Sequence, residues 1–175
     1  MTRYAAFLRG VNVGGVNLKM AEVASALADA GFSTVRTILA SGNVLLESPS
    51  KPGPVRARIE AALRERFGYD AWVLVYDVES VRAIFDAYPF EREVEGYQSY
   101  VTFVSDTKVL DELAALTAAS GEKISRGNGV IYWQVPKGST LDSTIGKTMG
   151  KPRYKSSTTT RNLRTLAKVL QAADK

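Results

Sequence analysis

The chain has 175 residues, of which 45% are hydrophobic and 23% are charged, and its formal net charge is +5; these values are ordinary for a globular protein with one domain or two small subdomains. It contains no Cys and no His, which excludes disulfides, thiolate nucleophiles, Ser-His-Asp catalysis and metal sites built on Cys or imidazole. Carboxylates, Lys, Arg, Tyr, Ser and Thr remain for chemistry, and we expect neither a metal nor a cofactor.

The first half of the chain alternates between strand and helix patterns. Apolar periodicity and turn residues predict strand 3–9, a glycine turn, helix 19–30, a hairpin of strands 34–39 and 44–47, a proline-rich loop, helix 55–67 and strand 71–76. Gly31 stands where a C′ glycine is expected, and Pro54 at the entrance of the second helix. The order βαββαβ is the split arrangement of a ferredoxin-like sandwich.

The second half is compatible with the same order. Its patterns predict helix 80–87, an acidic segment at 91–95, strand 98–104, a helix capped by Thr107, a hairpin of 122–126 and 130–135, a short helix with Leu141, Ile145 and Met149, an edge strand near 156–159 and helix 161–173 capped by Thr160. We therefore expect an α+β fold of two ferredoxin-like subdomains, 1–77 and 98–175, joined by a helix and acidic loop at 78–97.

The glycine turn after the first strand is the first candidate functional site. Glycines and asparagines lie there between a strand-end arginine and a helix-start lysine, at Arg9, Gly10, Asn12, Gly14, Gly15 and Lys19. The spacing matches neither the P-loop, because Val16 and Asn17 replace Lys and Ser/Thr, nor the dinucleotide fingerprint. Backbone amides ahead of a helix can still bind an anion, so we expect a phosphorylated or otherwise anionic small ligand.

The alternative interpretation is structural. The glycines would then only make a sharp strand-to-helix turn, with Arg9 paired to a carboxylate. Ser41 and Asn43 of the hairpin, and Arg161 with Asn162 near the last helix, are the predicted companions of the turn. The ligand interpretation requires these three segments to converge. The sequence decides neither the ligand nor whether a reaction, such as phosphoryl or acyl-phosphate chemistry, accompanies binding.

A basic segment is the second candidate site. Residues 137–168 carry eight Lys or Arg side chains and one acidic residue, Asp142, which suits an anionic partner such as nucleic acid. Arg161, Arg164 and Lys168 are predicted on one face of the last helix, where they could instead meet an acidic protein or remain solvated. Phe7, Tyr132 and Trp133 could stack bases, although buried aromatic residues usually form core.

The apolar runs of the sequence match neither a membrane span nor a secretory signal. No apolar run approaches the roughly 20 residues that span a bilayer, and the apolar run between Arg3 and Arg9 is too short and too charged for a secretory signal. We therefore expect a cytoplasmic protein with no membrane partner. The oligomeric state is not indicated.

Three motifs in order resemble those of a known family. Residues 7–15 read Phe-Leu-Arg-Gly-Val-Asn-Val-Gly-Gly, Lys19 and Met20 open a helix, and residues 41–44 read Ser-Gly-Asn-Val. With the closing Thr-Thr-Thr-Arg-Asn-Leu-Arg-Thr of residues 158–165, they resemble the bacterial domain of unknown function 1697 family, whose members usually carry Trp where this chain has Leu163. The resemblance implies a two-part α+β fold with ferredoxin-like character, and it implies no activity.

Overall fold

The chain folds into two compact units. The structure is a computed structural model that describes residues 1–11, 17–140 and 142–175. Unit 1 comprises Met1–Arg82 and Ala167–Lys175, and unit 2 comprises Ala83–Leu166. The divisions therefore fall within two helices, α3 (Val78–Asp86) and α6 (Leu163–Ala173). The subdomain boundaries expected at residues 77 and 98 stay a prediction.

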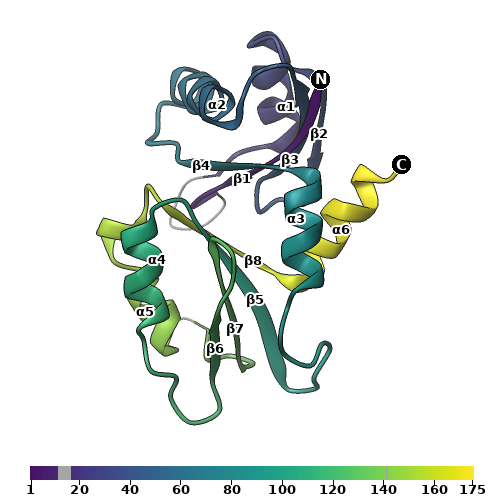
Figure 1. The fold of residues 1–175 in the computed structure, drawn as a ribbon. Helices are drawn as coiled ribbons and strands as arrows, with labels where there is room; N and C mark the ends of the chain where they lie inside the picture. Colours follow the sequence, from purple (N-terminus) through teal and green to yellow (C-terminus); the bar gives the residue numbers. More distant parts are fainter. Residues whose placement is uncertain (12–16, 141) are drawn as a thin grey trace. The chain divides into compact units, whose positions relative to one another are not determined.

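Unit 1 contains a four-stranded antiparallel sheet with two helices on one face (Figure 1). Its elements are β1 (Thr2–Leu8), α1 (Met20–Asp29), β2 (Ser33–Ile38), β3 (Asn43–Ser48), α2 (Pro52–Phe67) and β4 (Val73–Asp77). The strand order is β2-β3-β1-β4. Two strands that are not consecutive in the chain, β1 and β3, are thus central, as the split βαββαβ arrangement requires.

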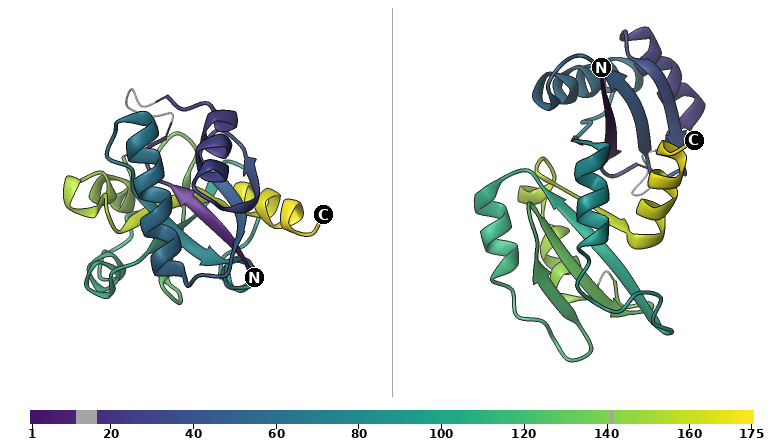
Figure 2. Two further views of the ribbon diagram at one scale, coloured as in Figure 1. Left: turned by 90° about the horizontal axis from the view of Figure 1, so that it is seen from above. Right: turned by 45° about the vertical axis from the view of Figure 1, so that its right-hand side comes forward.

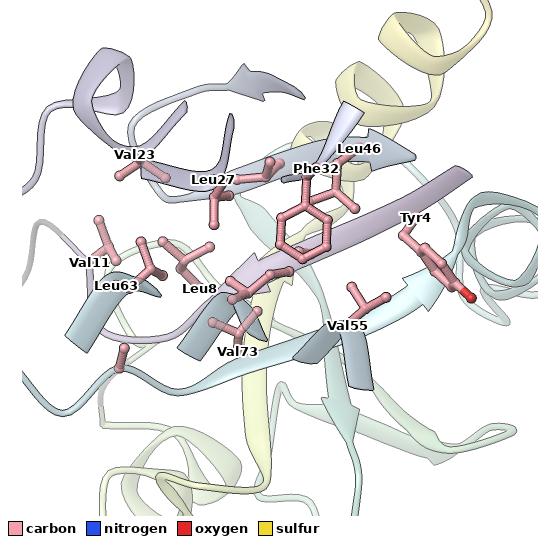
Figure 3. Close-up of a cluster of buried hydrophobic side chains, with 14 residues drawn as sticks. Tyr4, Leu8, Val11, Val23, Leu27, Phe32, Leu46, Val55, Leu63 and Val73 are labelled. Atoms are coloured by element: carbon pink, nitrogen blue, oxygen red, sulfur yellow. The ribbon is translucent and has the colours of Figure 1, made fainter. Parts of the chain in front are cut away.

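Alternating residues of β1 build the core of unit 1. Tyr4, Ala6 and Leu8 lie in one cluster with Val23 of α1 and Leu63 of α2, and Figure 3 shows these helical side chains directed toward the strand. Every second residue of the strand thus packs against the apolar faces of the two helices, which the sequence pattern predicts. The end of β1 is therefore held rigidly, and this end carries the glycine turn.

Unit 2 repeats the arrangement. Its elements are β5 (Tyr97–Val104), α4 (Thr107–Ala114), β6 (Lys123–Arg126), β7 (Val130–Pro136), α5 (Thr144–Met149), the 3₁₀-helix η1 (Pro152–Tyr154) and β8 (Thr158–Asn162). The antiparallel sheet has the order β6-β7-β5-β8, and α4 lies alongside it (Figure 2). The predicted α+β fold with two ferredoxin-like halves and a C-terminal helix is confirmed.

The core of unit 2 contains a hydrogen-bonded polar group. Trp133 stacks on Tyr100 with ring centroids 4.4 Å apart, and its indole nitrogen donates to Thr102 Oγ1 at 2.9 Å. The Thr102 hydroxyl is fully buried and also lies 2.8 Å from Thr160 Oγ1. The buried indole N–H is thereby satisfied, as a polar group in a core must be.

Three predicted helix starts are wrong. α2 begins at Pro52, inside the predicted loop. Asp106, not Thr107, caps α4, because its carboxylate accepts from the amides of Lys108 and Val109. The last helix begins at Leu163, because the preceding five residues pair with β5 as strand β8. Asn162 caps that helix by accepting from the Thr165 amide at 2.8 Å, so Thr160 is not the cap.

The prediction that three basic residues share one helical face is also wrong. Arg161 lies on β8 opposite Val101 and is 6% exposed, so it is not on α6. Arg164 and Lys168 are on the helix and exposed. Leu141, predicted to belong to the short helix, lies outside the described residues. No helix among the described residues is both long enough and apolar enough to span a bilayer.

Candidate functional site

The hairpin between β2 and β3 packs against the end of β1. The Leu8 amide donates to the Gly42 carbonyl at 2.8 Å. A Cβ on residue 42 would stand 2.8 Å from Leu8 Cβ and 3.5 Å from Val11 Cβ, and Figure 3 shows Val11 beside Leu8 and Leu63. The Ser41–Asn43 hairpin and the start of the glycine turn therefore lie side by side. They are two of the three segments that the ligand interpretation requires to converge.

Asn43 holds this hairpin together. Its side chain is fully buried, and Nδ2 donates to the Ile38 carbonyl at 2.8 Å and to Ser41 Oγ at 2.9 Å. Both amide hydrogens are used within the turn. Asn43 and Ser41 therefore shape the wall beside the glycine turn, and the donors of Asn43 are already engaged by the hairpin.

Arg9 and Gly10 lie where β1 leaves the sheet. The Arg9 amide donates to the Trp72 carbonyl at 2.9 Å, so the ladder with the β4 side extends past Leu8. Arg9 is half-buried, and this burial lowers the pKa of its guanidinium from the ordinary value of an arginine. Gly10 has φ +71°, and no atom of the described residues lies within 4 Å of where its Cβ would stand. The backbone thus turns sharply directly after Arg9.

Lys19 lies at the other end of the turn. It is exposed and occupies the N-cap of α1, with no side-chain cap bond. Its carbonyl accepts from the amides of Glu22 and Val23. The three remaining candidates of the turn, Asn12, Gly14 and Gly15, lie outside the described residues.

Arg161 and Asn162 belong to unit 2. Arg161 Nη1 donates to Thr159 Oγ1 at 2.9 Å and to the Thr160 carbonyl at 2.8 Å. Burial lowers the pKa of its guanidinium to about 9, so the group still carries its charge at neutral pH. A buried charged arginine is an unusual choice for a strand. Convergence of these two residues with the glycine turn stays a prediction.

Several basic side chains of the 137–168 segment are buried or already paired, so fewer are open to an anionic partner than the composition suggests. Arg161 is buried, Arg153 pairs with Glu112, and Arg164 pairs with Glu93 at 2.9 Å. Lys147, Lys151 and Lys155 are exposed and follow one another at four-residue intervals. None of these three lysines forms an ion pair with another residue in the described part of the chain.

The aromatic residues considered for base stacking are buried. Phe7, Tyr132 and Trp133 are all at most 3% exposed. The Tyr132 hydroxyl donates to the Ile84 carbonyl at 2.7 Å, and the Trp133 indole is held by Thr102. These side chains form core in the structure, so their faces are not open for a base.

A pocket in unit 2 was not predicted. It encloses about 270 Å³, and its lining includes Glu93, Glu95, Tyr97, Lys137 and Arg164. These residues come from three separate segments, so no local motif indicates the pocket. The acidic and the basic segments are each visible in the sequence as runs of charge, but only the fold brings them to one pocket.

Metal-binding geometry is lacking in the part of the chain that the structure describes, where no three Asp or Glu side chains gather as ligands could. The described part of the candidate site offers the guanidinium of Arg9 and the ammonium group of Lys19. These groups recognise anions.

Comparison with known proteins gives the fold and the family. No curated protein is significantly similar in sequence to this chain. A solved structure, "The structure of conserved bacterial protein SP0830 from Streptococcus pneumoniae", is similar with a TM-score of 0.82 and 23% identity, over 100% of this chain and 99% of that chain. This likeness concerns the fold alone. The family described as "Protein of unknown function (DUF1697)" matches residues 1–132, which include the motifs at residues 7–20 and 41–44, so the chain belongs to that family.

Proposed function

We propose that this is a cytoplasmic protein that binds a phosphorylated or otherwise anionic small ligand at the turn after β1. The observation that carries the proposal is a half-buried arginine, Arg9, followed directly by a left-handed Gly10 whose Cβ position has no atom of the described residues within 4 Å. A guanidinium partly removed from water gains more from an anion than an exposed one does.

Lys19 supplies the second positive group of the proposal. It stands at the N-terminus of the ten-residue helix α1, where the helix dipole adds to its charge. The rigid Ser41–Asn43 hairpin would limit the size of the ligand beside the turn. The remaining predicted ligand residues are Asn12, Gly14, Gly15, Arg161 and Asn162, and their participation stays a prediction.

Isothermal titration with inorganic phosphate, pyrophosphate, sugar phosphates and nucleotides tests this function. Lys19→Gln should weaken the best ligand about three- to tenfold, the effect of one charge-assisted contact. Lys51→Gln is the matched control, because Lys51 is an exposed lysine at the N-cap of α2, also without a side-chain cap bond. Equal losses in both variants would indicate nonspecific attraction and defeat the proposal.

Arg9→Gln gives the stronger test. It should reduce binding by more than Lys19→Gln does, because the guanidinium is the more desolvated group. Circular dichroism and a thermal melt establish that the variant is folded. If the wild type and Arg9→Gln bind every anion of the panel equally poorly, the turn has only a structural role.

Nucleic acid is the second candidate partner. The exposed Lys147, Lys151 and Lys155 favour it, since clustered lysines bind phosphates and release counterions. Retention of RNA or DNA should fall steeply with salt, and replacing the three lysines by Gln should flatten that slope. Binding that is insensitive to salt, or none near physiological ionic strength, removes this candidate.

A further inference from the structure

The unit 2 pocket is built from three segments that the sheet brings together. The Lys137 amide donates to the Gly96 carbonyl at 2.9 Å, and the Tyr97 amide donates to the Val94 carbonyl at 3.2 Å. Tyr97 also pairs with Pro136 in the β5–β7 register. These backbone contacts fix the turn at residues 93–97 beside Lys137, and Asn162 to Arg164 complete the lining.

The charges around this pocket are of both signs and only partly paired. Arg164 bonds Glu93 through two contacts of 2.9 and 3.4 Å, and this hydrogen-bonded pair raises the pKa of Arg164. Lys137 and Glu95 line the same pocket. Neither forms an ion pair with another residue in the described part of the chain.

We propose that this pocket binds a small zwitterion of the amino-acid type, whose carboxylate meets Lys137 and whose ammonium group meets Glu95. Opposite charges that face one cavity without neutralising each other are complementary to a ligand carrying both charges. A ligand of a single charge would leave one of the two groups facing its own sign or nothing.

The size and the walls of the pocket agree with this class of ligand. A volume of about 270 Å³ lies just below the range of about 300–1,000 Å³ that is typical for drug-sized ligands, so a molecule as small as an amino acid fits within it. The neutral polar residues Gln98 and Ser99 line it as well, and Tyr97, 38% exposed, offers an apolar surface to a side chain. The bonded Arg164–Glu93 pair forms a wall of zero net charge.

Glu93 combines a left-handed backbone with an ion pair to Arg164. Its φ is +57°, a left-handed value that costs a residue with a Cβ about 1 kcal/mol or more. Its carboxylate nevertheless stays on Arg164. Glu93 is therefore paired with Arg164, and it forms no ion pair with Lys137, the other cation of the lining, in the described part of the chain.

Amide chemical shifts of the full ¹⁵N-labelled chain provide the test. The probes are L-alanine, N-acetyl-L-alanine, which has only the negative charge, and L-alaninamide, which has only the positive charge. L-alanine should shift the amides of Gly96, Lys137 and Asn162 with a Kd on the order of millimolar, and each singly charged analogue should bind about fivefold more weakly.

Charge variants assign the two contacts. Lys137→Gln should make L-alanine bind no better than L-alaninamide, and Glu95→Gln should make it bind no better than N-acetyl-L-alanine. Both side chains are exposed, so the variants should fold. Lys155→Gln and Asp142→Asn, which change exposed charges away from the pocket, should leave L-alanine binding unchanged.

Two results would overturn the proposal. One is the absence of localised shifts with L-alanine. The other is that N-acetyl-L-alanine or inorganic phosphate binds as tightly as L-alanine, which would make the pocket a simple anion site. The site lies wholly within unit 2 and uses neither Arg9 nor Lys19, so its test is independent of the function proposed for the turn.

Discussion

Gly42 lies so close to Leu8 that the two residues leave no room for another side chain. The Cβ that any other residue would place at position 42 falls 2.8 Å from Leu8 Cβ, well inside van der Waals contact. The Gly42 carbonyl also accepts the Leu8 amide. This contact joins the hairpin to the end of β1, so the shape of the candidate site depends on it.

Gly42→Ala should therefore destabilise unit 1 strongly. The substitution adds a steric clash to a backbone with φ +87°, and the two costs together are expected to reach about 2–4 kcal/mol. Urea unfolding measures the loss. Gly53→Ala is the control, because Gly53 lies in the first turn of α2 with an ordinary φ and nothing within 4 Å. It should be neutral or slightly stabilising, and equal losses at both positions would contradict this account.

Asn43→Ala should also destabilise the protein, by about 2–3 kcal/mol. The change removes both donors of a fully buried amide and leaves the Ile38 carbonyl without that partner. Ser41→Ala removes one exposed acceptor, so it should cost less than half as much. Urea unfolding of both variants gives the comparison. If Asn43→Ala leaves the free energy of unfolding unchanged, the side chain has no structural role, and Asn43 is again a candidate ligand-binding residue.

The fold could be predicted because its signals are local. The alternating residues of β1 and the stripe of Val55, Ile59 and Leu63 on α2 each show their period in the sequence, and both lie in the unit 1 core. The chain order of these patterns then admits few topologies. The strand-to-helix boundary at Asn162 was harder, because Thr160 and Asn162 are both good caps, and only pairing with β5 selects between them.

The candidate site was predictable only in part. Arg9, Gly10 and Lys19 are contiguous with a recognisable turn, and the hairpin carries its own Gly and Asn signal. The burial of Arg161 could not be predicted, because a basic residue before an amphipathic helix is usually exposed. The unit 2 pocket was missed because Lys137 and Glu95 are 42 residues apart in the sequence and meet through the β5–β7 register.

Thr102→Val should destabilise unit 2 although it keeps the shape of the side chain. The change leaves the Trp133 indole N–H without its acceptor in a fully buried site, at a cost of about 1–3 kcal/mol. Thr102→Ser retains the hydroxyl and loses one methyl, so its cost should be about 1 kcal/mol. Tryptophan fluorescence during urea unfolding follows both variants. A Val variant as stable as the wild type would show that the hydroxyl is dispensable.

Stability should fall in alkaline solution, in part through Tyr76. Desolvation by burial raises the pKa of Tyr76 above its usual 10.0, although Arg56 acts in the opposite direction. The unfolded chain therefore loses this proton near pH 10 while the folded chain keeps it. The stabilising contribution is complete below about pH 10 and is lost as the pH rises toward the folded pKa.

Tyr76→Phe tests this dependence. The variant should lose less stability than the wild type between pH 9 and pH 11, whatever its stability at pH 7. The exposed Tyr97 provides the control, and Tyr97→Phe should follow the wild-type profile. Urea midpoints across this pH range give the comparison. Parallel profiles for Tyr76→Phe and the wild type would contradict the assignment.

Asn162→Ala should cost about 1 kcal/mol, because it removes the cap at the start of α6. Asn162→Asp should retain most of the stability, since a carboxylate accepts from the Thr165 amide and suits the positive end of the helix dipole. Thermal melts of both variants, read with the α6 amides by hydrogen exchange, separate a cap from a packing effect. Loss of protection should be concentrated in the first turn after Leu163. Equal destabilisation by Ala and Asp would show that the amide group is needed for something other than capping.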